Sequence, residues 1–134
     1  MAHRNRSAPG HSQPGHSQPG RSKEGARLVG ERGEDAAAAW YENAGYRIVE
    51  RNWRCAEGEI DVIASLEDTV VFCEVKSRSS DRFADPATAV DYRKQAKVRR
   101  AAFRWLEQQP WKHSLRFDVA VVLSGRVEMI EDAF

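Results

Sequence analysis

The sequence predicts an α/β or α+β sandwich in which a mixed sheet lies between two helices. Two apolar, β-branched segments at 58–64 and 70–76 flank a short, mostly polar break at 66–69, a pattern typical of a β-hairpin with a short loop. Helical patterns precede and follow this hairpin, and two further strand-like segments come last. The predicted order is therefore helix, three strands, helix, two strands.

Length, charge and cysteine usage indicate the class of protein. The 134 residues suit one domain with a sizeable core, and the net charge is only +1. Cys55 and Cys73 lie far apart within apolar segments, which favours reduced core thiols over a disulfide framework. No apolar run suits a membrane span or a signal peptide. We therefore expect a cytoplasmic protein that does not enter membranes.

Residues 1–22 form a predicted basic tail. The pentapeptide Gly-His-Ser-Gln-Pro occurs twice in succession there. Gly, Pro, Ser and His cannot bury enough apolar surface to offset the entropy lost on folding, so we expect disorder. His11 and His16 could bind a metal weakly, although a solvated tail is the simpler interpretation. The folded domain is predicted to span 23–134.

The first helix is predicted at 23–44. Four consecutive alanines at 36–39 favour a helix, and Gly45 supplies a stop at its C-terminus. Helical spacing places Glu34 on the same side as small or apolar residues, among them Tyr41. An acid on such a side is a candidate site residue, and a solvated glutamate is the alternative.

The central hairpin carries charged residues inside its apolar strands. A strand at 46–54 leads into it. Strand side chains alternate between faces, so Glu74 and Lys76 should point the same way, while Asp61 lies in the preceding strand. Buried charges cost free energy unless they are paired or bind a cation. Two interpretations follow: a structural ion pair, or a divalent-metal site with two carboxylate ligands.

The second helix is predicted from Asp85–Pro86, an N-cap followed by proline, to Gln109–Pro110, where proline stops it. A break near Asp91 could cap a second helical segment. Helical spacing predicts a core-facing apolar stripe, made up of Val90, Val98, Ala101 and Trp105. Strands at 115–123 and 127–130 follow, joined by a turn at Gly125.

Basic residues lie along this second helix. Lys94 falls on the apolar stripe, where it suits a phosphate or a carboxylate cluster, or simply snorkels to solvent. Arg93, Lys97, Arg100 and Arg104 recur at i, i+4, i+7 and i+11 and form a basic ridge. Such a ridge is either a solvated helix face or a track for nucleic-acid phosphates.

Several sequence blocks resemble the YraN-type family of small bacterial endonuclease-like proteins. These blocks lie at 33–34, 45–46, 51–54, 58–61, 71–78, 116–119 and 133–134. Asp61, followed by Glu74-x-Lys76 and preceded by a helix carrying Glu34, is similar to the core of the PD-(D/E)xK superfamily. That superfamily includes restriction enzymes and Holliday-junction resolvases. Ile60 replaces the leading proline of its signature, and the N-terminal repeat lies outside the resemblance.

The resemblance implies a restriction-endonuclease-like α-β-β-β-α-β-β core and a Mg²⁺- or Mn²⁺-dependent DNA endonuclease. It implies that Asp61, Glu74 and the backbone carbonyl of Val75 hold the metal, which lowers the pKa of bound water. Lys76 would orient or deprotonate this water, and Glu34 would be an additional ligand. The implied nucleic-acid-binding residues are Arg93, Lys94, Gln95, Lys97, Arg100 and Arg104.

Three functions remain open from the sequence. They are an endonuclease, which could prefer branched DNA; a non-catalytic nucleic-acid-binding or partner-recruiting module of the same fold; and a structural domain with a buried ion network. The apolar strand at 127–130 could pair with a second chain to form a homodimer, or the edge could be covered in a monomer.

Overall fold

A computed structural model describes residues 18–78, 90–110 and 113–134, with side chains from residue 31 onward. Its elements are α1 (Gln18–Asn43), β1 (Arg47–Cys55), β2 (Gly58–Leu66), β3 (Thr69–Arg78), α2 (Tyr92–Glu107), β4 (Ser114–Leu123) and β5 (Arg126–Ile130). This order confirms the predicted α-β-β-β-α-β-β core. The predicted helix start at Asp85–Pro86 and residues 1–17 of the predicted tail lie outside the described residues.

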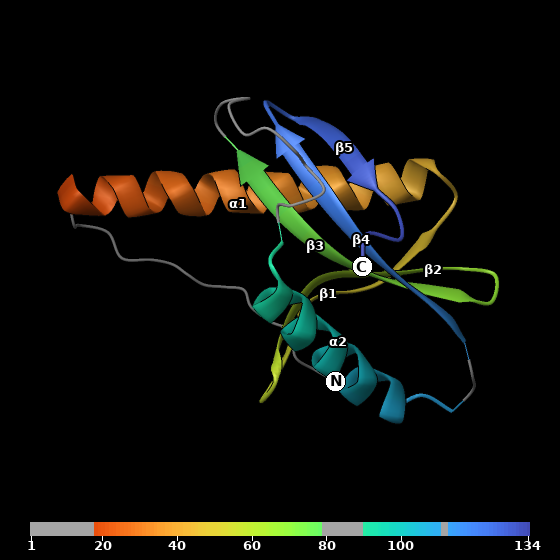
Figure 1. Ribbon diagram of the computed structural model, residues 1–134. Helices are drawn as coiled ribbons and strands as arrows, with labels where there is room; N and C mark the ends of the chain where they lie inside the picture. Colours follow the sequence, from red (N-terminus) through yellow and green to blue (C-terminus); the bar gives the residue numbers. More distant parts are fainter. Residues whose placement is uncertain (1–17, 79–89, 111–112) are drawn as a thin grey trace.

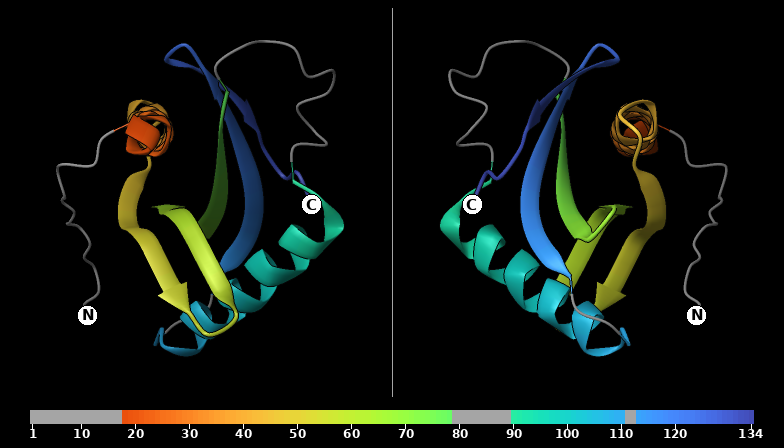
Figure 2. Two further views of the ribbon diagram at one scale, coloured as in Figure 1. Left: turned by 90° about the vertical axis from the view of Figure 1, so that its left-hand side faces the viewer. Right: turned by 90° about the vertical axis from the view of Figure 1, so that its right-hand side faces the viewer.

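The strands form one mixed sheet in the order β1-β2-β3-β4-β5 (Figure 1). Adjacent strands are antiparallel except for β3 and β4, which are parallel. A parallel pair needs a crossover connection, and α2 lies within it. Helices α1 and α2 cover opposite faces of the sheet, as the predicted sandwich requires (Figure 2). None of the described helices is long and apolar enough to cross a membrane.

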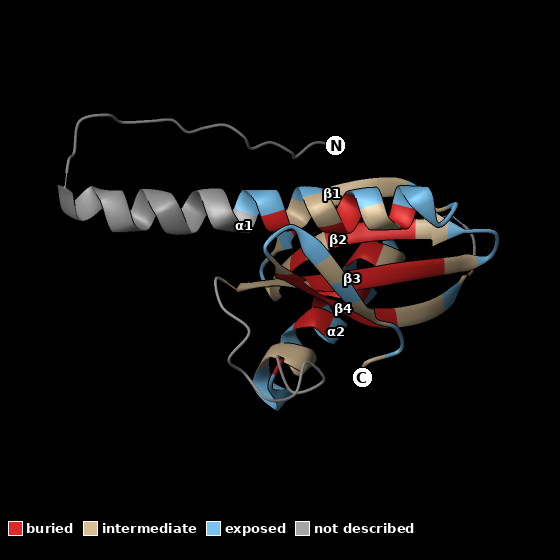
Figure 3. Cartoon of the chain, turned by 90° about the horizontal axis from the view of Figure 1, so that it is seen from above, coloured by how far each residue is buried: buried red, intermediate tan, exposed pale blue. Residues whose placement is uncertain are grey.

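Each sheet face packs against one helix, and buried residues fill both contacts (Figure 3). Ala37 and Tyr41 of α1 pack on one face, together with Val71 and Cys73 of β3. On the other face Phe72 packs edge-on against Trp105 of α2, with ring centroids 5.8 Å apart. Alternate residues of β3 therefore face opposite helices, as the strand period predicted. The predicted stripe is buried as well: Val90, Val98, Ala101 and Trp105.

Local sequence signals explain how the elements begin and end. The backbone of Gly45 adopts φ 97°, which suits glycine, and the Tyr46 N–H donates to the Tyr41 carbonyl at 2.9 Å. The Asp91 side chain accepts the Lys94 N–H at 2.9 Å, so the predicted cap starts α2 at Tyr92. Helix α1 begins at Gln18, earlier than the predicted residue 23.

Candidate functional site

The sheet opens between β2 and β3 at Asp61 and Glu74. The antiparallel ladder runs from Leu66 opposite Thr69 to Val62 opposite Cys73, and one further step would pair Asp61 with Glu74. Instead, a carboxylate oxygen of Asp61 accepts the backbone N–H of Val75 at 2.8 Å. The Asp61 side chain thus takes the place of a strand carbonyl, and the two acidic residues meet where the ladder stops.

Glu74 is a buried carboxylate on the α2 side of the sheet, with 4% of its surface exposed. Its Oε2 lies 3.1 Å from the Lys94 Nζ, which reaches in from the first turn of α2. Its Oε1 is buried and has no hydrogen-bond partner in the described part of the chain. A buried carboxylate oxygen without a donor is costly, and a cation is one group that would satisfy it.

Glu34 approaches the same site from α1. Its Oε1 accepts a hydrogen bond from the Asn52 side chain at 3.0 Å and lies 3.8 Å from the Arg51 guanidinium. The negative charges of Glu34 and Asp61 are close enough to repel each other. The structure therefore brings Glu34 near Asp61, and Asp61 near Glu74, and these three residues from separate elements form a carboxylate cluster.

Gly33 explains how α1 comes so close to β3. A Cβ atom at this position would collide with the Oγ of Ser77, which is itself buried. Glycine avoids that collision because it has no Cβ atom. The close contact brings the next residue, Glu34, to the edge of the carboxylate cluster.

The three carboxyl groups all resist ionisation. Burial, and then the charge of Glu74, raises the pKa of Asp61 to about 7. Burial, followed by the charge of Asp61, raises the pKa of Glu34 to about 7. Burial also raises the pKa of Glu74, although Lys94 and Lys76 partly offset it. A cation near these groups would favour their ionised forms.

The donor set fits a hard divalent cation such as Mg²⁺ or Mn²⁺. Glu74 offers its unpartnered Oε1, and Asp61 offers carboxylate oxygen beside it. The Val75 carbonyl leaves the strand at the same edge as the N–H that Asp61 binds, so it points into the opening. Among the described residues, no three His, Cys, Asp or Glu side chains form a ready-made metal site. A cation here would therefore also need backbone and water ligands.

Two lysines lie near the carboxylates, and a glutamine lies beside one of them in the chain. Lys76 is partly exposed, and its positive charge offsets part of the rise that burial causes in the pKa of Glu74. The ammonium of Lys94 pairs with Glu74 although 40% of its side chain is exposed, so this residue contacts the carboxylate cluster. The side-chain amide of Gln95 donates to the Val90 carbonyl at 3.0 Å, which holds it near the start of α2.

The basic ridge of α2 lies on its exposed side. Arg93, Lys97 and Arg100 are exposed and have no ion-pair partner within the described ranges. Arg104 differs, because its guanidinium lies 3.0 Å from a carboxylate oxygen of Glu57. Three of the four predicted ridge residues therefore point a charge toward solvent that no described residue neutralises.

Comparison with known proteins identifies the family. Residues 33–122 match the sequence profile of the uncharacterised protein family UPF0102. The protein belongs to the UPF0102 family. It is 46% identical to a UPF0102 protein of Frankia casuarinae over 112 residues, which cover 79% of this chain and 95% of that relative. It is 46% identical to a UPF0102 protein of Syntrophus aciditrophicus over 110 residues, which cover 78% of this chain and 87% of that relative. It is 45% identical to one of Moorella thermoacetica over 115 residues, which cover 81% of this chain and 96% of that relative.

The matched region of this UPF0102 protein contains all the predicted site residues, whereas the N-terminal repeat lies outside it. The YraN-type resemblance seen in the sequence is thereby confirmed at the level of the family.

Sequence reasoning missed Asn52, which holds Glu34 in place. Its backbone lies in the left-handed region, with φ 54°, a conformation that asparagine adopts more readily than most residues. It is flanked by the ladder pairs Arg51–Val62 and Trp53–Ile60, so it lies opposite Asp61 on the neighbouring strand. An asparagine between charged and aromatic strand residues was the only available signal.

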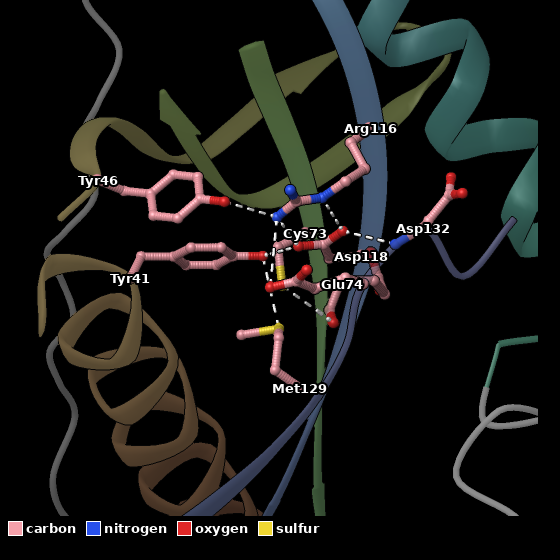
Figure 4. A network of polar contacts seen from close by, with 9 residues as sticks. Tyr41, Tyr46, Cys73, Glu74, Arg116, Asp118, Met129 and Asp132 are labelled. Atoms are coloured by element: carbon pink, nitrogen blue, oxygen red, sulfur yellow. Dashed lines mark hydrogen bonds and ion pairs between the residues drawn. The ribbon is translucent and has the colours of Figure 1, made fainter. Parts of the chain in front are cut away.

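A second polar network in this UPF0102 protein was also missed (Figure 4). Asp118 is fully buried and accepts two hydrogen bonds from the Arg116 guanidinium, both at 2.9 Å. The Tyr41 hydroxyl donates to the same carboxylate at 2.6 Å, and the Asp132 N–H donates at 3.0 Å. This network ties α1, β4 and the C-terminal turn together. The opposite charges at 116 and 118 inside an apolar strand were the signal that could have found it.

Proposed function

We propose that this UPF0102 protein is a divalent-metal-dependent DNA endonuclease that hydrolyses phosphodiester bonds and prefers branched DNA. The observation that carries this proposal is the opening between β2 and β3. There Asp61 faces Glu74, whose buried Oε1 has no partner among the described residues. The raised pKa of Asp61, about 7, follows from the same arrangement and fits a functional site, because perturbed carboxyl groups cluster at such sites.

Each residue of the site has a role in this proposal. Asp61, Glu74 and the Val75 carbonyl would hold Mg²⁺ or Mn²⁺, and the metal would lower the pKa of bound water and neutralise charge on the scissile phosphate. Lys76 orients the attacking water or accepts its proton, and its positive charge then stabilises the phosphorane-like transition state. Glu34 is held by Asn52 at the rim, where it binds water or adds a ligand.

The start of α2 provides contacts for the rest of the substrate. Lys94 already lies beside Glu74, and Gln95 is fixed next to it by its hydrogen bond to Val90. In the proposal these two residues contact the phosphate next to the scissile one. The exposed ridge residues Arg93, Lys97 and Arg100 contact phosphates further along the strand.

One observation favours a second candidate, a nucleic-acid-binding module without catalysis. The ammonium of Lys94 pairs with Glu74 at 3.1 Å, so this carboxylate already has a counter-charge without a metal ion. A binding module would need the fold and the basic residues of α2 but no cation. The two candidates differ in whether divalent metal and hydrolysis are required.

A cleavage assay separates them. Purified wild type is incubated with labelled single-stranded, duplex, flap and four-way DNA, with RNA controls, in Mg²⁺, in Mn²⁺ and in EDTA. We expect metal-dependent cleavage, greatest on branched DNA, and its loss in Asp61→Asn and Lys76→Met. The isosteric Asp61→Asn keeps an oxygen for the Val75 N–H, so loss of activity there reports on chemistry rather than folding.

Two results would refute the proposal. Equal cleavage by wild type and Asp61→Asn would show that the activity comes from a contaminant. Binding of DNA with no cleavage of any substrate in either metal would favour the binding module instead.

A further inference from the structure

The outer side of α2 exposes two aromatic rings. Tyr92 is 86% exposed and Phe103 is 55% exposed, more than any other large hydrophobic side chain in the described part of the protein. They lie about three helical turns apart, so both project from the same side of the helix, roughly 16 Å from each other. Single exposed apolar residues are ordinary, but two aligned aromatic rings on a basic helix form a patterned surface.

Arg99 lies between the two rings on this side of α2. Its guanidinium stacks over the rings of Phe117 and Phe134, at 5.7 and 5.2 Å from their centroids. The arginine is therefore held flat against the body of the protein while remaining exposed. Planar groups that can stack thus recur along the helix from Tyr92 through Arg99 to Phe103.

The charge beside this aromatic stripe indicates what it binds. Helix α2 contains six lysines and arginines but only one acid, Glu107 in its last turn. The ridge residues Arg93, Lys97 and Arg100 project next to the rings, and none has an ion-pair partner among the described residues. A second copy of the chain would bring the same cations face to face, so charge opposes self-association here. An anionic partner with flat apolar surfaces complements the face.

We propose that this face of α2 binds single-stranded nucleic acid, with Tyr92 and Phe103 stacking on bases and Arg93, Lys97 and Arg100 contacting phosphates. Single-strand-binding surfaces combine these two features, because every base has a face that can stack. In a duplex the base faces are covered by neighbouring pairs, so the rings gain nothing there. The surface therefore selects unpaired strands.

The place of the aromatic stripe on α2 adds a substrate class to the proposed endonuclease function, on which this part of the inference rests. Tyr92 is the first residue of α2, and Lys94 of the same turn pairs with Glu74. A strand lying along α2 therefore reaches the carboxylate cluster at the N-terminal end of the helix. The substrate class would be DNA with a single-stranded arm next to the scissile phosphate.

Binding is tested in EDTA, so that cleavage plays no part. Fluorescence anisotropy compares labelled oligothymidylate of about 20 nucleotides with a duplex of the same length. We expect tighter binding of the single strand. Tyr92→Ala and Phe103→Ala should each weaken that binding about tenfold, as loss of one stacked base would. Tyr92→Phe and Phe103→Tyr keep a ring and should bind like wild type.

The controls distinguish failure of this inference from failure of the endonuclease proposal. Glu42→Gln, on the opposite side of the sheet, should bind the single strand like wild type, and circular dichroism checks that each variant is folded. Ring-dependent binding without cleavage would support this inference and refute the endonuclease. Metal-dependent cleavage combined with unchanged binding by both alanine variants would refute this inference alone. Ring-dependent binding to vesicles of anionic lipid, with none to the oligonucleotide, would also overturn it.

Discussion

Replacing Asp61 with asparagine should stabilise the metal-free protein, although it destroys the proposed site. The side chain lies among other carboxylates, and burial together with the charge of Glu74 raises its pKa from the ordinary 3.8 to about 7. Asparagine has the same shape and can still accept the Val75 N–H. The substitution therefore removes a repelled negative charge while keeping the hydrogen bond.

The size and pH dependence of this effect follow from the pKa of Asp61. A change in the pKa of Asp61 from 3.8 to about 7 makes its ionisation in the folded protein about 4 kcal/mol less favourable than in the unfolded chain. Asp61 keeps some contact with solvent, and Glu74 can adjust its own protonation, so we expect about 2 kcal/mol at pH 8. The unfolded carboxyl ionises first as pH rises, so wild type loses this stability between about pH 4 and pH 7.

Urea unfolding at several pH values measures this prediction. The free energy of unfolding of Asp61→Asn should exceed that of wild type by about 2 kcal/mol at pH 8, with the difference disappearing near pH 4. Glu42→Gln is the control, because Glu42 is exposed on α1 and should show no such trend. A destabilised Asp61→Asn at pH 8, or an effect independent of pH, would refute the account of a strained carboxylate cluster.

Two further substitutions test how the site is supported. Gly33→Ala should lower the free energy of unfolding by about 1 kcal/mol in urea unfolding, because crowding against Ser77 outweighs the higher helix propensity of alanine. Ser77→Ala removes the buried oxygen that the new Cβ would meet, and this oxygen has no described partner. The double variant Gly33→Ala/Ser77→Ala should therefore recover the lost stability, and a double variant as unstable as Gly33→Ala would contradict this explanation. Arg116→Met should lower the free energy of unfolding by about 3 kcal/mol, because it leaves the buried Asp118 without its counter-charge. Thermal unfolding measures this change, and a loss of less than about 1 kcal/mol would contradict the prediction.

The sequence predicted those features that depend on short-range periodicity. Alternation along β3 correctly predicted that Glu74 and Cys73 face opposite sides of the sheet. Helical spacing correctly predicted that Val98 and Trp105 are buried. The N-cap at Asp91 could also be predicted from the sequence, because side-chain capping is a local interaction.

Features that depend on tertiary contacts could not be read from the sequence. The ladder between β2 and β3 stops because the Asp61 side chain binds Val75, and no local pattern specifies this. The hydrogen bond from Asn52 to Glu34 depends on how α1 crosses β1. The bond from Tyr41 to Asp118 joins residues far apart in the chain. In each case a polar side chain finds its partner only after the helices have packed on the sheet.

The proposed function requires that Asp61 and Glu74 together hold a divalent cation. The most direct test is a crystal of the wild-type protein grown with Mn²⁺, with anomalous diffraction recorded near the manganese absorption edge. We expect an anomalous peak within bonding distance of Asp61, the Oε1 of Glu74 and the Val75 carbonyl, and no peak in Asp61→Asn crystals. Wild-type density without such a peak, with Glu74 still paired only to Lys94, would contradict it.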